Sequence, residues 1–110
     1  MIEGLYSVIF GTPQGNVGGG VVVFRNGKAQ GGDLAYFYDG VVRAGVGDHV
    51  EADVLIRKYQ EAGESVFGNI PEFRLQLKGQ VAGPRFVLDG QIVGNPAARI
   101  TVQFSKLADA

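Results

Sequence analysis

Apolar and polar residues alternate along much of this chain with a period of two. The clearest runs cover residues 73–78 and 99–104, where every second residue is apolar. Successive side chains of a β-strand point to opposite faces, so this period is typical of a strand with one buried face. Neither run has the period of a helix. The pattern therefore predicts an all-β fold.

Turn signals divide the chain into short segments. Asn26-Gly27 supplies two positions that tolerate positive φ, and Gly83-Pro84 and Asn95-Pro96 are further predicted turns. Residues 60–71 interrupt the alternation and predict a longer loop or a short helix. The pattern predicts about eight strands: Gly4–Thr12, Asn16–Arg25, Lys28–Gly31, Tyr38–Ala44, His49–Tyr59, Glu72–Val81, Arg85–Val93 and Ala98–Leu107.

Consecutive short strands joined by tight turns form a meander, and closure of the meander removes exposed strand edges. We therefore expect a single domain, residues 1–110, that is an antiparallel up-and-down β-barrel. The interior is predicted to hold one apolar face from each of the later strands: Val50, Ala52, Val54, Ile56, Phe73, Leu75, Leu77, Phe86, Leu88, Ile100, Val102 and Phe104. These side chains either fill the barrel or line a ligand cavity.

The first two predicted strands are apolar on both faces. Tyr6, Val8 and Phe10 share one face, which leaves other apolar side chains on the outside. The outward set is predicted to form a homodimer interface, the alternative being ordinary exposed apolar residues: Leu5, Ile9, Val21 and Val23.

Composition narrows the classes of function. Of 110 residues, 45% are hydrophobic, so the chain can bury a core. Ten basic and eleven acidic residues give a net charge of -1, which argues against direct nucleic-acid binding. The absence of cysteine removes disulfides and thiolate metal sites. The acidic Glu3 near the N-terminus does not fit a secretory signal, and no apolar run is long enough for membrane insertion. We therefore expect a cytoplasmic protein.

The candidate catalytic and metal-binding groups have simpler explanations. His49 is the only histidine and begins a strand whose polar face, with Glu51 and Asp53, is expected to be solvated. The glycines at 15 and 18–20 run into a strand instead of opening a helix, which does not fit a phosphate loop. We therefore expect no catalytic residue, no metal and no cofactor. Of the three classes of function that we consider, an enzyme, a regulatory protein and a ligand carrier, the enzyme has the least support from the sequence.

Several short motifs near the N-terminus occur in a familiar order. They are Gly4-Leu5-Tyr6-Ser7-Val8-Ile9-Phe10, then residues 20–24, Asn26-Gly27, and Gly31-Gly32-Asp33 followed by Tyr38 and Gly40. Over about the first 45 residues the chain resembles the GrlR family of bacterial negative regulators of type III secretion. The resemblance implies a small lipocalin-like, or calycin-like, barrel that dimerises. Gly4-Leu5-Tyr6 also resembles the Gly-x-Trp opening of lipocalins, which places Tyr6 inside.

In the regulatory members of that family, an acidic loop after the fourth strand contacts a transcriptional activator. The corresponding loop here, residues 43–48, has one carboxylate, Asp48, where the family pattern has four. The partner surface suggested by the resemblance is therefore Asp48 with Glu51 and Asp53, and the second choice is Glu61 with Glu64 on the long loop. Asp33, by contrast, is predicted to accept backbone N–H bonds within a turn.

Two leading hypotheses follow from the sequence. One is a non-enzymatic regulatory or adaptor protein that acts through protein contacts, by sequestering a transcriptional activator, for example. The other is a lipocalin-like carrier or sensor of a small apolar ligand. An interior filled by side chains would exclude the carrier hypothesis, whereas a cavity of roughly several hundred Å³ would support it.

Overall fold

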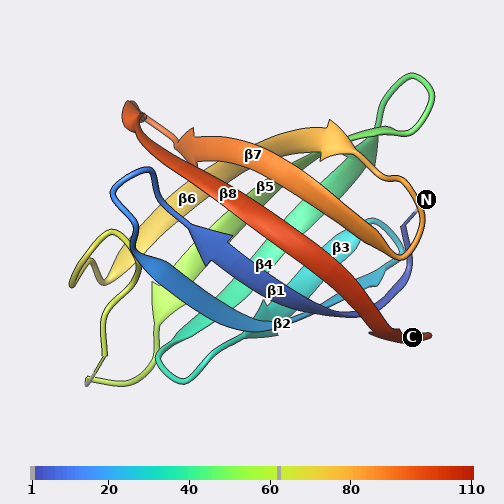
Figure 1. Ribbon diagram of the computed structural model, residues 1–110. Helices are drawn as coiled ribbons and strands as arrows, with labels where there is room; N and C mark the ends of the chain where they lie inside the picture. Colours follow the sequence, from blue (N-terminus) through green and yellow to red (C-terminus); the bar gives the residue numbers. More distant parts are fainter. Residues whose placement is uncertain (1, 62) are drawn as a thin grey trace.

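The computed structural model describes residues 2–61 and 63–110, and these residues form strands and no helix. Figure 1 shows the strands in chain order. Their bounds are β1 (Gly4–Gly11), β2 (Val17–Arg25), β3 (Lys28–Gly32), β4 (Tyr36–Ala44), β5 (His49–Lys58), β6 (Glu72–Gln80), β7 (Arg85–Ile92) and β8 (Asn95–Ala108).

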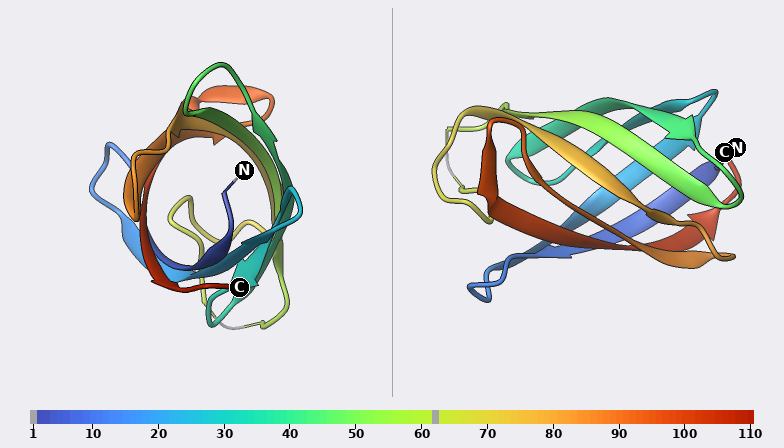
Figure 2. Two further views of the ribbon diagram at one scale, coloured as in Figure 1. Left: turned by 90° about the vertical axis from the view of Figure 1, so that its right-hand side faces the viewer. Right: turned by 90° about the horizontal axis from the view of Figure 1, so that it is seen from above.

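The eight strands form one closed antiparallel barrel. Each strand pairs with the next in sequence, and β8 pairs with β1, which completes the ring. The view along the barrel in Figure 2 shows the ring and the N-terminal segment crossing its opening. The predicted all-β, eight-stranded, up-and-down barrel is confirmed, and it is consistent with a lipocalin-like fold.

The hairpin turns follow the rule that tight turns need positive φ. Asn26 has φ 52° and Gly27 has φ 76°, as the prediction of a hairpin there requires. The predicted turn at Asn95-Pro96 is wrong, because the turn lies at Val93-Gly94 and Ile92 pairs with Asn95. Gly94 supplies the positive φ of 86°. Pro96 is tolerated because β1 pairs with β8 only from Thr101 onward, which leaves the start of β8 with one neighbouring strand.

The long connection between β5 and β6 is a loop in its described part. Ser65 and Gly68 exchange two backbone hydrogen bonds of 3.0 Å, which forms a tight turn. The side chain of Asn16, on the β1–β2 connection, donates to the carbonyl oxygen of Val66 at 3.0 Å. Val66 is buried, so this loop reaches back into the end of the barrel. Ala62 lies outside the described residues.

The barrel interior holds the core that the alternation predicts. Each predicted interior residue is buried except Phe73, which is partly buried and packs against the same core. Tyr6 is also interior, as the lipocalin-like opening implies. Sequence reasoning did not include several further core residues from the first four strands: Val22, Phe24, Ala29, Tyr36 and Val42.

The outer face of β1 and β2 is apolar, as predicted. Leu5 pairs with Val23 and Ser7 with Val21, so these side chains share the outer surface. Ile9 is 56% exposed and Val21 is 46% exposed. Leu5 and Val23 are partly buried. The predicted assignment of faces in the first two strands is therefore correct.

Candidate functional site

The barrel interior contains a cavity of about 600 Å³ that opens at one end. Ligand pockets commonly measure roughly 300–1,000 Å³, so the space suits one small molecule. Its walls are mostly apolar side chains from the interior faces of the strands: Val8, Val22, Ala29, Ala52, Val54, Ile56, Leu75, Leu77, Leu88, Ile100 and Val102. The cavity lies toward the end of the barrel that carries the β1–β2, β3–β4 and β5–β6 connections, at the left of Figure 1.

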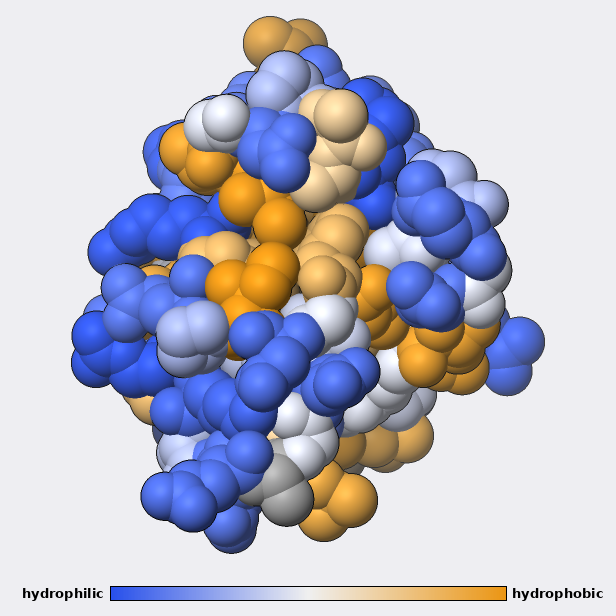
Figure 3. Space-filling model, turned by 90° about the vertical axis from the view of Figure 1, so that its left-hand side faces the viewer, coloured by the Kyte–Doolittle hydropathy of each residue, from blue (hydrophilic) through white to orange (hydrophobic). Residues whose placement is uncertain are grey.

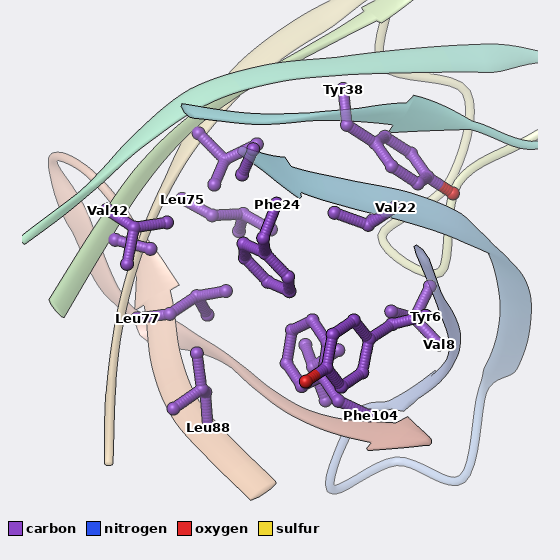
Figure 4. Close-up of a cluster of buried hydrophobic side chains, with 14 of the residues drawn as sticks. Tyr6, Val8, Val22, Phe24, Tyr38, Val42, Leu75, Leu77, Leu88 and Phe104 are labelled. Carbon is purple, nitrogen blue, oxygen red and sulfur yellow. The ribbon is translucent and has the colours of Figure 1, made fainter. Parts of the chain in front are cut away.

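Packed aromatic rings fill the other end of the barrel. Phe86 and Phe104 stack with ring centroids 4.8 Å apart, and Tyr6 meets Phe24 edge to face at 5.4 Å. Figure 4 shows Tyr6, Phe24 and Phe104 pointing toward one another inside the barrel. Phe24 and Phe104 line the cavity, whereas Tyr6 and Phe86 do not. The aromatic cluster is therefore the floor of the cavity.

The open end is bordered by a second aromatic group. Phe73 lies 5.6 Å from Phe67 and 6.3 Å from Tyr36, measured between ring centroids. The Tyr36 hydroxyl donates to the carbonyl oxygen of Ile70 at 2.7 Å, which attaches the β5–β6 loop to the barrel wall. Figure 3, which views this end of the molecule, shows apolar residues gathered near its middle between hydrophilic ones.

Asp33 forms the main polar contact in the cavity wall. Its Oδ1 atom accepts hydrogen bonds from the backbone N–H groups of Ala35 and Tyr36, each at 2.8 Å. Its Oδ2 atom accepts the Tyr38 hydroxyl at 2.5 Å. The predicted role of Asp33 in the turn is confirmed, and Tyr38 joins that role. Burial, followed by the hydrogen bond to Asp33, raises the pKa of Tyr38 far above its ordinary value.

Glycines on the inner face of β2 make room for these side chains. A Cβ at Gly18 would lie 2.5 Å from the Phe10 ring, and one at Gly20 would lie 2.7 Å from the Tyr38 hydroxyl oxygen. Gly31 and Gly40 have a different role. A Cβ there would lie 1.9 Å and 2.4 Å from backbone oxygens of the adjacent strand. The glycine-rich segments thus allow both close strand approach, as predicted, and the placement of the Asp33–Tyr38 pair.

The predicted partner surface lies on the outside of the barrel, away from the cavity. Asp48 is exposed in the β4–β5 turn. Asp53 is paired with Arg43 at 2.6 Å, and Glu51 lies 3.6 Å from the His49 ring nitrogen Nε2. Because Asp53 is paired with an arginine, the surface is less acidic than the sequence suggests.

The structure brings together most of the predicted cavity residues. Eight of the ten line the cavity: Val54, Phe73, Leu75, Leu77, Leu88, Ile100, Val102 and Phe104. The missed residues are mainly those of the open end, including Tyr36, Val66 and Asn16. Tyr36 begins β4 earlier than predicted, and its interior spacing with Tyr38 was a usable signal. Val66 had none, because its position depends on a contact with a distant segment.

Within residues 2–61 and 63–110 there is no helix long and apolar enough to cross a membrane. No protein-family model matches the sequence, and no curated protein matches it either.

Proposed function

We propose that this protein binds a small apolar molecule inside the barrel, as a carrier or sensor. The observation that supports this function is the cavity of about 600 Å³ with its apolar walls. An eight-stranded barrel can be filled completely by side chains, and this one is filled at one end only. An apolar ligand entering this space leaves water and gains contacts with the surrounding side chains.

The architecture gives the ligand one natural entrance. The aromatic cluster and the buried Ile2 occupy the end where the chain begins. The other end is covered by the β5–β6 loop, which is held by the Asn16 and Tyr36 hydrogen bonds. Entry therefore takes place at this end, past the described residues of the loop, whereas the aromatic cluster blocks the opposite end.

Binding can be tested with N-phenyl-1-naphthylamine, an uncharged apolar dye whose fluorescence rises in apolar surroundings. We expect saturable binding of one dye per chain. Ala52 is buried in the cavity wall, so Ala52→Phe places a ring in the cavity and should weaken binding at least about tenfold. Ala97→Phe adds the same ring at an exposed position of β8 and should leave binding unchanged.

Two outcomes would contradict the carrier function. One is the absence of saturable dye binding to the unmodified protein. The other is equal affinity in the Ala52→Phe and Ala97→Phe variants, provided that circular dichroism shows both to be folded. In that case the dye binds the outer surface.

A second proposed function is that of a non-enzymatic regulatory protein of the GrlR type, cytoplasmic and acting through protein contacts, with a transcriptional activator as the partner. The observation in its favour is the apolar outer face of β1 and β2, with Ile9 and Val21 about half exposed. Apolar patches of this kind are common at interfaces, and a homodimer would cover it. The two functions are compatible, because the patch and the cavity lie on opposite faces of the same strands.

Sedimentation at micromolar concentration tests the dimer. The unmodified chain should sediment as a dimer, and the double variant Ile9→Asp with Val23→Asp should be a folded monomer, because a buried unpaired carboxylate is costly. Val41→Asp, at an exposed position on the outer face of β4, is the matched control and should remain dimeric. An unmodified protein that sediments as a monomer would exclude this interface.

A further inference from the structure

The charged side chains that line the cavity are all acidic. In the described part of the chain they are Asp33 and Glu64, and no lysine, arginine or histidine borders the space. Asp33 lies in the wall between β3 and β4, and Glu64 lies on the β5–β6 loop that covers the entrance. Within the cavity a ligand therefore meets carboxylates and no basic group, while Lys58, at the same end of the barrel, donates to Asn69 on the β5–β6 loop at 2.6 Å.

The hydrogen bonds around Asp33 show which groups remain available to a ligand. The Asp33 carboxylate accepts three hydrogen bonds, from the N–H groups of Ala35 and Tyr36 and from the Tyr38 hydroxyl. The carboxylate oxygens have further lone pairs to offer. The Tyr38 hydroxyl donates its one hydrogen bond to Asp33, so the hydroxyl oxygen can only accept a bond from a ligand. Both groups present acceptors to the cavity.

These acceptors favour one class of ligand over another. A carboxylate-bearing ligand would bring a second negative charge beside Asp33 with no cation to balance it, and an unpaired charge is costly in apolar surroundings. An ammonium group has the opposite charge and three donors, and charge-assisted hydrogen bonds are stronger than neutral ones. A neutral alcohol can donate one bond without the gain from charge.

We infer that the cavity selects cationic amphiphiles, such as long-chain amines, whose polar end lies at the Asp33–Tyr38 pair and whose apolar chain extends to the aromatic floor. This inference rests on the proposed carrier function and specifies its ligand class. Alcohols of the same length bind more weakly, and fatty-acid anions bind most weakly.

The experiment measures displacement of bound N-phenyl-1-naphthylamine by dodecylamine, dodecanol and dodecanoate. The three have equal chains and differ at the polar end, and all are used at neutral pH below the concentrations at which they form micelles. The amine is protonated under these conditions, as a lysine side chain is. We expect dodecylamine to compete at least about tenfold more tightly than dodecanoate, with dodecanol between them.

Substitutions assign the preference to particular groups. Asp33→Asn keeps an acceptor for the turn and removes the charge, so it should bring amine and carboxylate affinities to within a few fold. Asp39→Asn removes a carboxylate from the outer face of β4 and should change nothing. Tyr38→Phe leaves the Asp33 charge and should retain the preference. Glu64→Gln should reduce it by a smaller factor.

Each result bears on a separate statement. If the dye binds and dodecanoate competes as tightly as dodecylamine, the ligand class is wrong while the carrier function stands. If the dye does not bind the unmodified protein, both fail. If Asp33→Asn is folded and keeps the full preference, Asp33 is not the recognising group and the inference is overturned. If that variant does not fold, the order of the three ligands on the unmodified protein decides.

Discussion

Replacement of Asp33 by alanine should destabilise the barrel strongly, because one side chain satisfies three donors. The Oδ1 atom accepts the N–H groups of Ala35 and Tyr36, and Oδ2 accepts the Tyr38 hydroxyl. All three donor residues are buried, with exposed fractions of 7%, 2% and 8%. Alanine offers no acceptor to any of them.

The size of the effect follows from the number of donors. A buried donor without a partner costs about 1–3 kcal/mol. Asp33 itself is only partly buried, so water can reach part of the turn, and we take the lower end of that range for each donor. The expected loss for Asp33→Ala is therefore about 2–4 kcal/mol in the free energy of unfolding. Asp33→Asn keeps an acceptor for the two N–H groups and should cost about 1 kcal/mol.

Urea unfolding followed by far-ultraviolet circular dichroism measures these losses. Asp39→Ala is the control, because its carboxylate bonds only to the exposed Gln30 side chain, and it should change stability by less than about 0.5 kcal/mol. A loss below about 1 kcal/mol for Asp33→Ala would refute the argument. An equal loss for the alanine and asparagine variants would show that charge, and not the turn hydrogen bonds, sets the effect.

Burial and the Asp33 hydrogen bond raise the pKa of Tyr38 above its ordinary 10.0, so the unfolded chain loses the hydroxyl proton at a lower pH than the folded chain. The free energy of unfolding should therefore fall as the pH rises above 10. Urea titrations should show a smaller fall for Tyr38→Phe. Gly31→Ala should cost at least about 3 kcal/mol in urea unfolding, since its Cβ would lie 1.9 Å from the Val21 carbonyl oxygen and only a shift of backbone can relieve this contact. Reversal of Asp48, Glu51 and Asp53 to lysine should leave the barrel folded, with a lower melting temperature because Asp53→Lys replaces the Arg43 ion pair by a like-charge contact. It should slow association with a basic protein partner at low salt, and an unchanged rate in stopped-flow mixing would exclude this surface.

The strands and their buried faces could be predicted because each strand of a small barrel has one apolar and one polar side. The runs around Leu75 and Val102 carry this alternation with little interruption, and both lie inside the barrel. The turn at Asn26-Gly27 could be predicted because few residue pairs tolerate its backbone angles. At Asn95-Pro96 the same reasoning chose the wrong pair, since Gly94 satisfies the turn and the following proline fits an unpaired strand edge.

The cavity could not be predicted to the same degree. Alternation shows which side chains point inward, but whether they fill the space depends on how rings from distant strands pack. Phe86 and Phe104 stack closely at one end, whereas small residues of the cavity wall such as Ala29 and Ala52 leave interior space unfilled. The loop residue Val66 is placed by Asn16, which lies 50 positions earlier in the sequence. Neither contact has a local signal.

The pairing of β1 with β8 also has a consequence for how the chain folds. Ser7 meets Ser105 across this seam, a separation of 98 residues. Contacts so distant in sequence form late, because the ordering of the intervening chain costs entropy before the contact is made. Until the seam closes, β1 keeps one unpaired edge, and such an edge can add a strand from another molecule. During synthesis that edge stays open until the ribosome has released β8, so the time between the emergence of the first and last strands is the period in which this protein is most exposed to aggregation.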